Sequence, residues 1–326
     1  MPDTMPPVAA ATAGAVCISS SAVLMRLAST SASITALGRC AFALPVLGVL
    51  VLLERRRGAP SLPSRGRWLA RLAGVFLAAD LIVWSHAISA IGAGLGTVVT
   101  NLQVLIISLL AWLFLGERPR RSLVLASPVM LAGLALVGGL AGAGGARAYG
   151  TDPALGVAYG AGVAVLYAVY ILLLRQATST AGAGAAVAAP LFEATAGATA
   201  GAMVLGLVLH DFRLGPAWPA LGWLALLALT SQVCGWLLIT VSMPRLAAGM
   251  IGALLLIQPA GSVALSYVIL GERPSALQLL GVALVLAGVV VAVTRRTPAG
   301  GYSRPSTRII RHASGASTGE SVSKSP

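Results

Sequence analysis

Long runs of apolar residues dominate this chain of 326 residues, and they limit its possible folds more than any other feature. Several runs hold about 20 residues, the length that an α-helix needs to cross roughly 30 Å of hydrocarbon. Charged residues make up 10% of the chain, against about 25% in soluble domains. So few charges cannot cover the surface of a soluble domain of this size. The sequence therefore predicts an all-α polytopic membrane protein.

The apolar runs divide into ten spans, separated by charges, prolines or glycine clusters. The predicted spans cover approximately residues 8–28, 32–53, 68–90, 93–115, 121–141, 154–174, 186–209, 218–241, 247–270 and 276–294. The segment 295–326 is rich in Ser, Gly and Arg. It is too polar to pack, and we expect a disordered cytoplasmic tail.

The basic residues indicate how these spans are oriented. Loops on the cytoplasmic side of a membrane keep an excess of Lys and Arg. With both termini inside, 17 of the 22 Lys and Arg lie on the inner side and four on the outer side, while Arg39 falls within a span. The net charge of +13 therefore indicates topology and not nucleic-acid binding, because the arginines are scattered between apolar spans. We expect a multi-pass protein of the cytoplasmic membrane with both termini cytoplasmic.

The sequence also repeats itself without gaps at an offset of 155 residues. The matched residues include Gly116, Glu117, Pro119 and Gln103 in the first copy and Gly271, Glu272, Pro274 and Gln258 in the second. Each copy, residues 1–150 and 151–294, holds five predicted spans. Because five is odd, the second copy must enter the membrane from the opposite side. The two copies are then inverted repeats related by a pseudo-two-fold axis in the membrane plane.

Ten spans in two repeats, with a Gly-Glu pair closing the fourth and ninth spans before a Pro, resemble the EamA-type members of the drug/metabolite transporter superfamily. The resemblance covers about residues 10–294. It implies a carrier that exports or exchanges small metabolites, amino acids or drugs by alternating access, and it does not fix a substrate. The chain has no Walker-type phosphate loop. We then expect an ion gradient, with the proton as the proposed ion, or a substrate gradient to drive transport.

The residues shared by the repeats have a structural interpretation. Gly116 and Gly271 can end a helix in the left-handed conformation, and Pro119 and Pro274 suit the first turn of the next helix. Glu117 and Glu272 can then accept hydrogen bonds from the free N–H groups of that following helix. We interpret the motif as a rigid hairpin cap, with a direct role in transport as the alternative. Being present in both repeats, Gln103 and Gln258 are likewise expected to serve the fold.

The ionisable side chains Arg39, Asp80, His86 and Glu193 lie well inside the spans and need a reason, since each is costly there. Arg39 and Asp80 lie closer in membrane depth than Arg39 and Glu193, so we expect Arg39 to reach Asp80. Glu193 would remain as the spare acid, and we expect Asp80 and Glu193 to bind cationic groups or exchange protons. Two alternatives stay open: Arg39 binds a substrate carboxylate, or Arg39 and Asp80 form a buried ion pair that only joins two helices.

A polar stripe on the fourth span is a second candidate for substrate contact. Thr97, Thr100 and Asn101 share one helical face, whereas their counterparts in the second repeat cannot form side-chain hydrogen bonds. A polar stripe in one repeat alone suits an asymmetric substrate, and interhelical hydrogen bonding is the alternative. Trp84 and other aromatic residues can line an amine-binding cavity. Anchoring at the membrane interface explains several of them equally well.

Other classes of function find little support in the sequence. No His or Cys spacing suggests a metal site, and no motif suggests a cofactor or an enzyme. The expected partners are a small-molecule substrate and membrane lipids, and nothing defines an oligomeric state. A lipid-moving or helper membrane protein without a soluble substrate is the alternative to a transporter.

Overall fold

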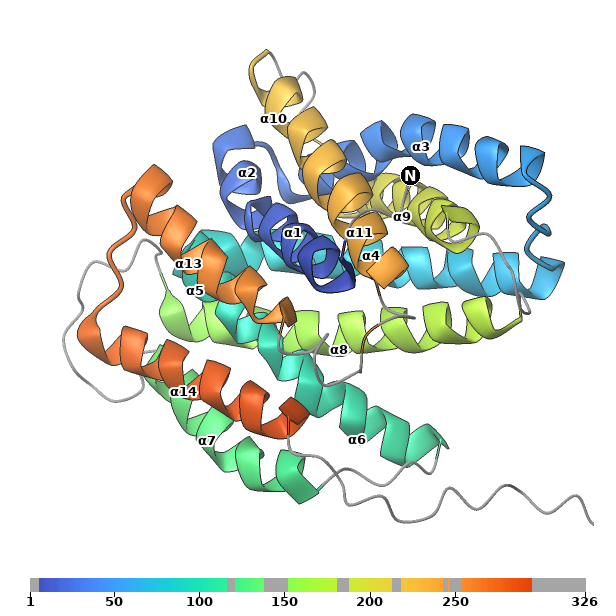
Figure 1. Ribbon diagram of the computed structural model, residues 1–326. Coiled ribbons are helices and arrows are strands. Elements are labelled where there is room, and N and C mark those ends of the chain that lie inside the picture. Colours follow the sequence, from blue (N-terminus) through green and yellow to red (C-terminus); the bar gives the residue numbers. More distant parts are fainter. Residues whose placement is uncertain are drawn as a thin grey trace, which may run out of the picture. The chain divides into compact units, whose positions relative to one another are not determined.

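The computed structural model describes residues 6–115, 121–137, 152–180, 188–212, 218–242, 246 and 254–294 as helices and short connections (Figure 1). Among these residues, seven helical segments are long and apolar enough to cross a membrane, and three are shorter apolar helices. The ten segments correspond to the ten predicted spans, so the all-α polytopic fold is confirmed. Gly116, Glu117, Pro119 and the tail 295–326 lie outside the described residues.

The first repeat contains several helices that change direction or hydrogen-bond pattern within a span. Its elements are α1 (Pro7–Ser19), α2 (Ser21–Ala28), α3 (Ala32–Arg56), α4 (Ser64–Ile91), α5 (Ala93–Val99), the 3-10 turn η1 (Thr100–Leu102), α6 (Gln103–Leu115) and α7 (Arg121–Val137). Ser31 caps α3 by accepting a hydrogen bond from the backbone N–H of Ile34. Gly92, with φ of 97°, separates α4 from α5 in a conformation that favours glycine.

The second repeat has the corresponding elements with different irregularities. They are α8 (Pro153–Ser179), α9 (Ala188–Val208), α10 (Ala220–Leu227), the π-helical segment η2 (Ala228–Gly235), α11 (Trp236–Ser242), α13 (Ile257–Leu270) and α14 (Ala276–Thr294). Leu256 forms a turn directly before α13. At the 155-residue offset this turn corresponds to Asn101 in η1, so both repeats interrupt the same span at the same position.

Contacts between the helices follow the two-fold relation of the repeats. The third span, α4, packs against α8 and α9, and its counterpart, the eighth span, packs against α1, α2 and α3. The counterpart helices α7 and α14 also pack on each other. There Gly133 lies against Gly281, and Gly288 lies near Ala126. The 155-residue offset relates Gly133 to Gly288 and Ala126 to Gly281, so the two contacts are equivalent. Such reciprocal contacts are those that a two-fold axis requires.

Small residues bring α4 and α9 close together. A Cβ atom on Gly74 would meet backbone atoms of Gly197 and Ala198, and one on Gly197 would meet the backbone of Arg71. Backbone atoms cannot move aside as side chains can, so these glycines set the distance between the two helices.

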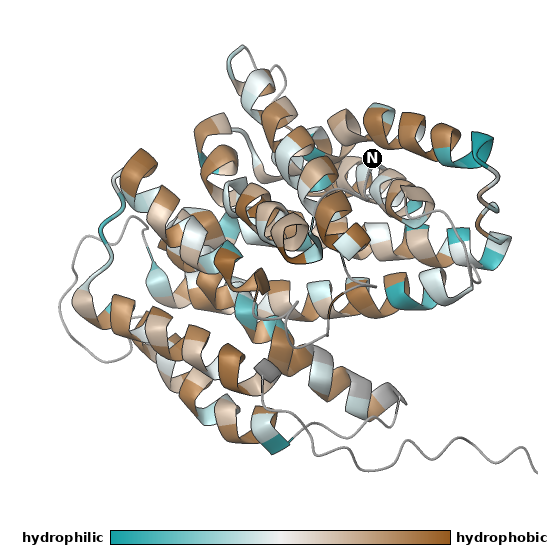
Figure 2. Ribbon diagram, in the orientation of Figure 1, coloured by the Kyte–Doolittle hydropathy of each residue, from teal (hydrophilic) through white to brown (hydrophobic). Residues whose placement is uncertain are grey.

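The outer surface of the helices is apolar, as expected for a protein in lipid. Exposed large hydrophobic residues include Val49, Leu52, Leu125 and Val268. Hydrophilic residues gather at the C-terminal ends of α3 and α8 and at the start of α4, on the right-hand side of Figure 2. The end of α3 carries Arg55 and Arg56, the end of α8 carries Arg175, and the start of α4 carries Arg65 and Arg67.

Candidate functional site

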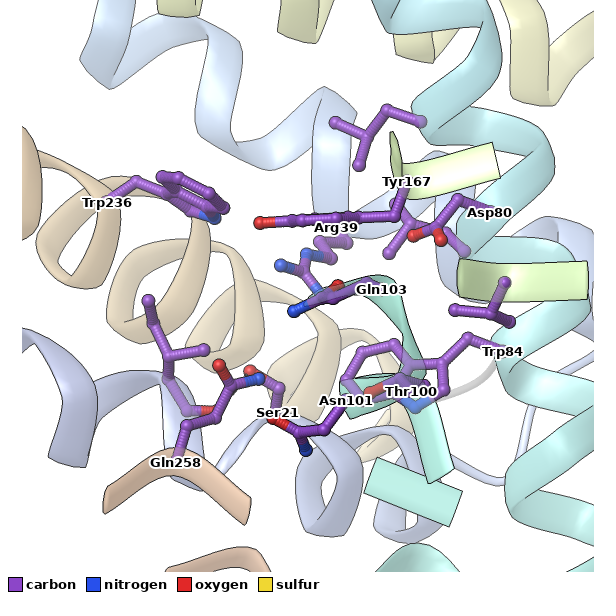
Figure 3. Close-up of a pocket in the computed structure, with 14 residues that line it drawn as sticks. Ser21, Arg39, Asp80, Trp84, Thr100, Asn101, Gln103, Tyr167, Trp236 and Gln258 are labelled. Carbon is purple, nitrogen blue, oxygen red and sulfur yellow. Dashed lines mark hydrogen bonds between the residues drawn. The ribbon is translucent and has the colours of Figure 1, made fainter. Parts of the chain in front are cut away.

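A cavity lies between the two repeats and is lined by both (Figure 3). The space between the lining side chains, including the part open to solvent, is about 610 Å³. Its polar and aromatic lining residues are Ser21, Arg39, Asp80, Trp84, Thr100, Asn101 and Gln103 from the first repeat and Tyr167, Trp236 and Gln258 from the second. A concave site with apolar walls and a few convergent polar groups is typical of small-molecule binding.

Arg39 projects from α3 into this cavity, and its side chain is 95% buried. Its Nε donates a hydrogen bond of 3.0 Å to Gln232 Oε1, and Nη2 donates one of 3.2 Å to Ser231 Oγ. The guanidinium carbon lies 6.0 Å from the centre of the Trp84 ring, within cation–π range. Nη1 has no hydrogen-bond partner among the described residues. Arg39 is therefore fixed in place with one donor still free.

The partners of Arg39 lie on the π-helical segment η2. Ser231 accepts a further hydrogen bond of 2.6 Å from Ser21 Oγ on α2, and Gln232 Nε2 donates one of 3.3 Å to Thr195 on α9. This buried network links elements of both repeats around a single cation. π-helical segments are rare and often occur at functional sites, since they change which side chains face inward.

Asp80, on α4, is the carboxylate of the cavity among the described lining residues. It is 96% buried, and its Oδ1 has no hydrogen-bond partner among the residues that the structure describes. Both Asp80 and Arg39 are described, yet they form no ion pair with each other. The expected Arg39–Asp80 pair is therefore not found. Arg39 and Asp80 instead each keep a buried polar atom without a hydrogen-bond partner among the described residues.

Glu193 differs most from its expected role. Its Oε2 accepts a hydrogen bond of 2.7 Å from Nε of Arg71, an arginine near the start of α4. The long Arg71 side chain, 60% exposed, reaches along α9 to this acid. Glu193 also does not line the cavity. The acid without a partner is Asp80 and not Glu193.

Gln103 and Gln258 line the cavity, although their presence in both repeats had indicated a role in the fold alone. Gln103 is the first residue of α6, and Gln258 is the second residue of α13. Each follows the interruption that the two repeats share. Figure 3 shows Gln103 beside Arg39, and Gln258 on the far side of the cavity from Asp80.

Comparison with known proteins now identifies the family. The sequence pattern of the EamA-like transporter family matches residues 5–139 and again residues 154–294. The chain belongs to the EamA-like transporter family. This family is part of the drug/metabolite transporter superfamily, and it is a family of transporters and not of enzymes.

Solved structures share the fold of this EamA-like transporter. One crystal structure, titled only as that of a protein, has a TM-score of 0.57 and 20% sequence identity, covering 88% of this chain and 96% of the other. At that identity the likeness concerns the fold alone. A search of curated proteins found no match.

The polar stripe of the transporter's fourth span is only partly directed at the cavity. Thr97 donates to Ala93 O at 2.8 Å and accepts from Ser262 on α13 at 3.1 Å, so it joins two helices and does not line the cavity. Thr100 and Asn101 line the cavity. Their side chains donate to backbone carbonyls of Thr97 and Val98. Hydroxyl and amide groups on helices commonly make such local hydrogen bonds.

Glu272 caps a helix, but not the one that follows it. Its two carboxylate oxygens accept hydrogen bonds from the backbone N–H groups of Ala93 at 2.7 Å and Gly94 at 3.1 Å, at the start of α5 in the other repeat. The following helix, α14, is capped instead by Ser275 and Gln278. Gly271 ends α13 in the left-handed conformation, with φ of 67°. The counterpart Glu117 lies outside the described residues.

Several residues of the site carry weak or no signals in the sequence. Ser231 and Gln232 are ordinary polar residues within an apolar span, and their role follows from the π-helical register of η2. Arg71 gave no signal because it stands near a membrane edge. Within the described part of the chain, no group of three or more His, Cys, Asp or Glu is placed to hold a metal ion.

Proposed function

We propose that this EamA-like transporter is a secondary carrier that binds a small organic molecule in the cavity and moves it by alternating access, as an exporter or exchanger. The cavity between the repeats carries the proposal, because both repeats line it and an inverted repeat allows it to open to either side in turn. Arg39 Nη1 and Asp80 Oδ1, buried and without a partner in the described part of the chain, would supply a donor and an acceptor for the transported molecule.

The charges of the cavity favour a proton or a cationic group at Asp80. Arg39 and Asp80 together are neutral, so an anionic substrate brings one negative charge that needs compensation in the membrane interior. A proton taken up by Asp80, or an amine on the substrate, provides it. We therefore propose the proton as coupling ion, acting at Asp80 and not at Glu193, the other acid from which proton exchange was expected.

The proposal includes the topology. The repeats, residues 1–150 and 151–294, are placed with both termini on the cytoplasmic side of the cytoplasmic membrane. The gathering of basic helix ends on one side supports this orientation (Figure 2). Impermeant thiol reagents applied to single cysteines should label the segment Gly142–Tyr149 from outside and the segment Arg55–Arg57 from inside. Labelling of both segments from the same side would overturn the inverted arrangement.

Transport by purified protein in proteoliposomes tests the main proposal. We expect at least one member of a panel of radiolabelled amino acids, organic acids, amines and dyes to be transported, and an imposed proton gradient to accelerate it. An Arg39→Gln variant of comparable thermal stability should lose most of that transport. A flat response across the panel would overturn the proposal and favour the lipid-moving or helper alternative.

A further inference from the structure

Gln103 and Gln258 are the two glutamines of the cavity that the fold leaves free. Among the described residues, neither carboxamide has a hydrogen-bond partner, whereas Gln232 and Gln278 have partners. Both side chains are half-buried and line the cavity, whereas a carboxamide that serves the fold is generally hydrogen-bonded to the protein. Two free carboxamides at corresponding positions of the two repeats are better explained by a ligand than by packing.

Several polar groups around these glutamines are donors, beside the carboxylate of Asp80 and the hydroxyl groups of Ser21, Thr100 and Tyr167. Arg39 Nη1 and Trp84 Nε1 are buried and have no partner among the described residues, and each carboxamide adds an NH₂ group. Several donors that converge on one space suit a group with many acceptor lone pairs.

The charge of the cavity limits that group to a single negative charge. One arginine faces it, and Asp80, the acid among the described lining residues, lies on the far side of the cavity from Gln258 (Figure 3). A doubly charged phosphate would have one cation for two charges. A carboxylate matches the arginine in charge and offers two oxygens, with about four lone-pair sites, to the donors.

We infer that Gln103 and Gln258, together with Arg39, form a subsite that binds the carboxylate group of the transported molecule. The inference rests on the proposed function, because it assigns the chemistry of the same cavity. Since the two glutamines belong to opposite repeats, a carboxylate that contacts both also links occupancy of the cavity to the relative position of the repeats.

Matched pairs of probes test the subsite without knowledge of the natural substrate. The probes are carboxylates and their primary amides: acetate and acetamide, benzoate and benzamide, alanine and alaninamide. Binding to the full-length protein in lipid nanodiscs is measured by tryptophan fluorescence, because Trp84 and Trp236 line the cavity. For at least one pair, we expect the carboxylate to bind about tenfold or more tightly than its amide. Equal affinity within every pair, or no binding of any probe, would overturn the inference.

Glutamate variants then identify the residues. Gln103→Glu and Gln258→Glu keep the side-chain shape but replace a donor with a negative charge, so each should weaken the carboxylate about tenfold or more and its amide much less. Gln278→Glu is the control: Gln278 is buried and donates to Val137 O outside the cavity, so this variant should change the melting temperature and not the preference. Gln→Asn variants, with a shorter reach, give a second series if a glutamate variant does not fold. An unchanged preference in both series would refute the role of the glutamines.

The outcome can be separated from that of the transport proposal. If the proteoliposomes transport a solute that has no carboxylate, and Gln103→Glu and Gln258→Glu leave that transport unchanged, the carrier stands and the subsite is wrong. If the probes bind with the expected preference while no panel member is transported, the subsite stands and the proposed transport is wrong.

Discussion

Asp80 and Glu193 are both buried acids, and their neighbours give them different chemistry. Asp80 has a free carboxylate oxygen in the cavity, whereas Glu193 is paired with Arg71 outside it. We predict that Asp80→Asn abolishes the acceleration of transport by a proton gradient, because the amide cannot exchange a proton. Glu193→Gln should keep that acceleration and change the free energy of unfolding by less than about 1 kcal/mol, since Arg71 is largely exposed. Initial rates with and without a gradient, together with thermal unfolding, measure both effects.

Loss of the acceleration in Glu193→Gln but not in Asp80→Asn would reverse this assignment.

The sequence identified Arg39, Asp80 and Trp84 because charged and aromatic residues stand out in apolar spans. It did not predict their partners, because depth in the membrane says nothing about the direction in which a side chain points around its helix. The π-helical register that brings Ser231 and Gln232 to Arg39 also departs from the 3.6-residue period on which sequence patterns rely.

The contact between α4 and α9 gives a prediction for whole helices. Gly74→Ala and Gly197→Ala each place a methyl group against backbone atoms, so each should lower the free energy of unfolding by about 1–3 kcal/mol. Gly48→Ala is the matched control, because its new Cβ would only touch Phe192 Cε2 at 3.5 Å. Melting temperatures in one detergent compare the three variants. Equal melting of all three would mean that the two helices can separate without loss.

The spans themselves were predictable because the length of an apolar run is a strong signal. Their internal breaks were not. Thr100 and Asn101 lie in η1, Pro259 follows the turn at Leu256, and serines surround the break between α1 and α2. Such residues do not mark a break by themselves, since α3 continues through Pro45. These breaks depend on packing between helices, which no local pattern contains.

Glu272 joins the two repeats of the whole molecule. It is 96% buried and holds two backbone N–H groups of α5 from the opposite repeat. Glu272→Ala leaves these donors without an acceptor, so we predict a loss of about 1–3 kcal/mol in the free energy of unfolding. Asp152→Ala is the control, because it removes the exposed N-cap of α8, and it should lower the free energy of unfolding by less. A smaller loss for Glu272→Ala than for Asp152→Ala would show that the link between the repeats contributes little.

At this scale the sequence was most informative about symmetry and least informative about contacts. An odd number of spans per repeat predicted the inversion, and the matched contacts of the spans agree with it. The partner of Glu272 could not be predicted, because its nearest helix start in sequence is that of α14, whereas the start of α5 is nearest in space.

The contact of α7 with α14 suggests how such a carrier could arise. Gly133 on α7 contacts Gly281 on α14, and Gly288 on α14 contacts Ala126 on α7, so the two counterpart helices pack through the same face. A shorter ancestral gene encoding a single five-helix product, inserted in both orientations, would already have carried this surface in every copy. Two such copies could pair as an antiparallel dimer before any gene fusion, and joining the genes would have fixed the pair and freed each half to diverge.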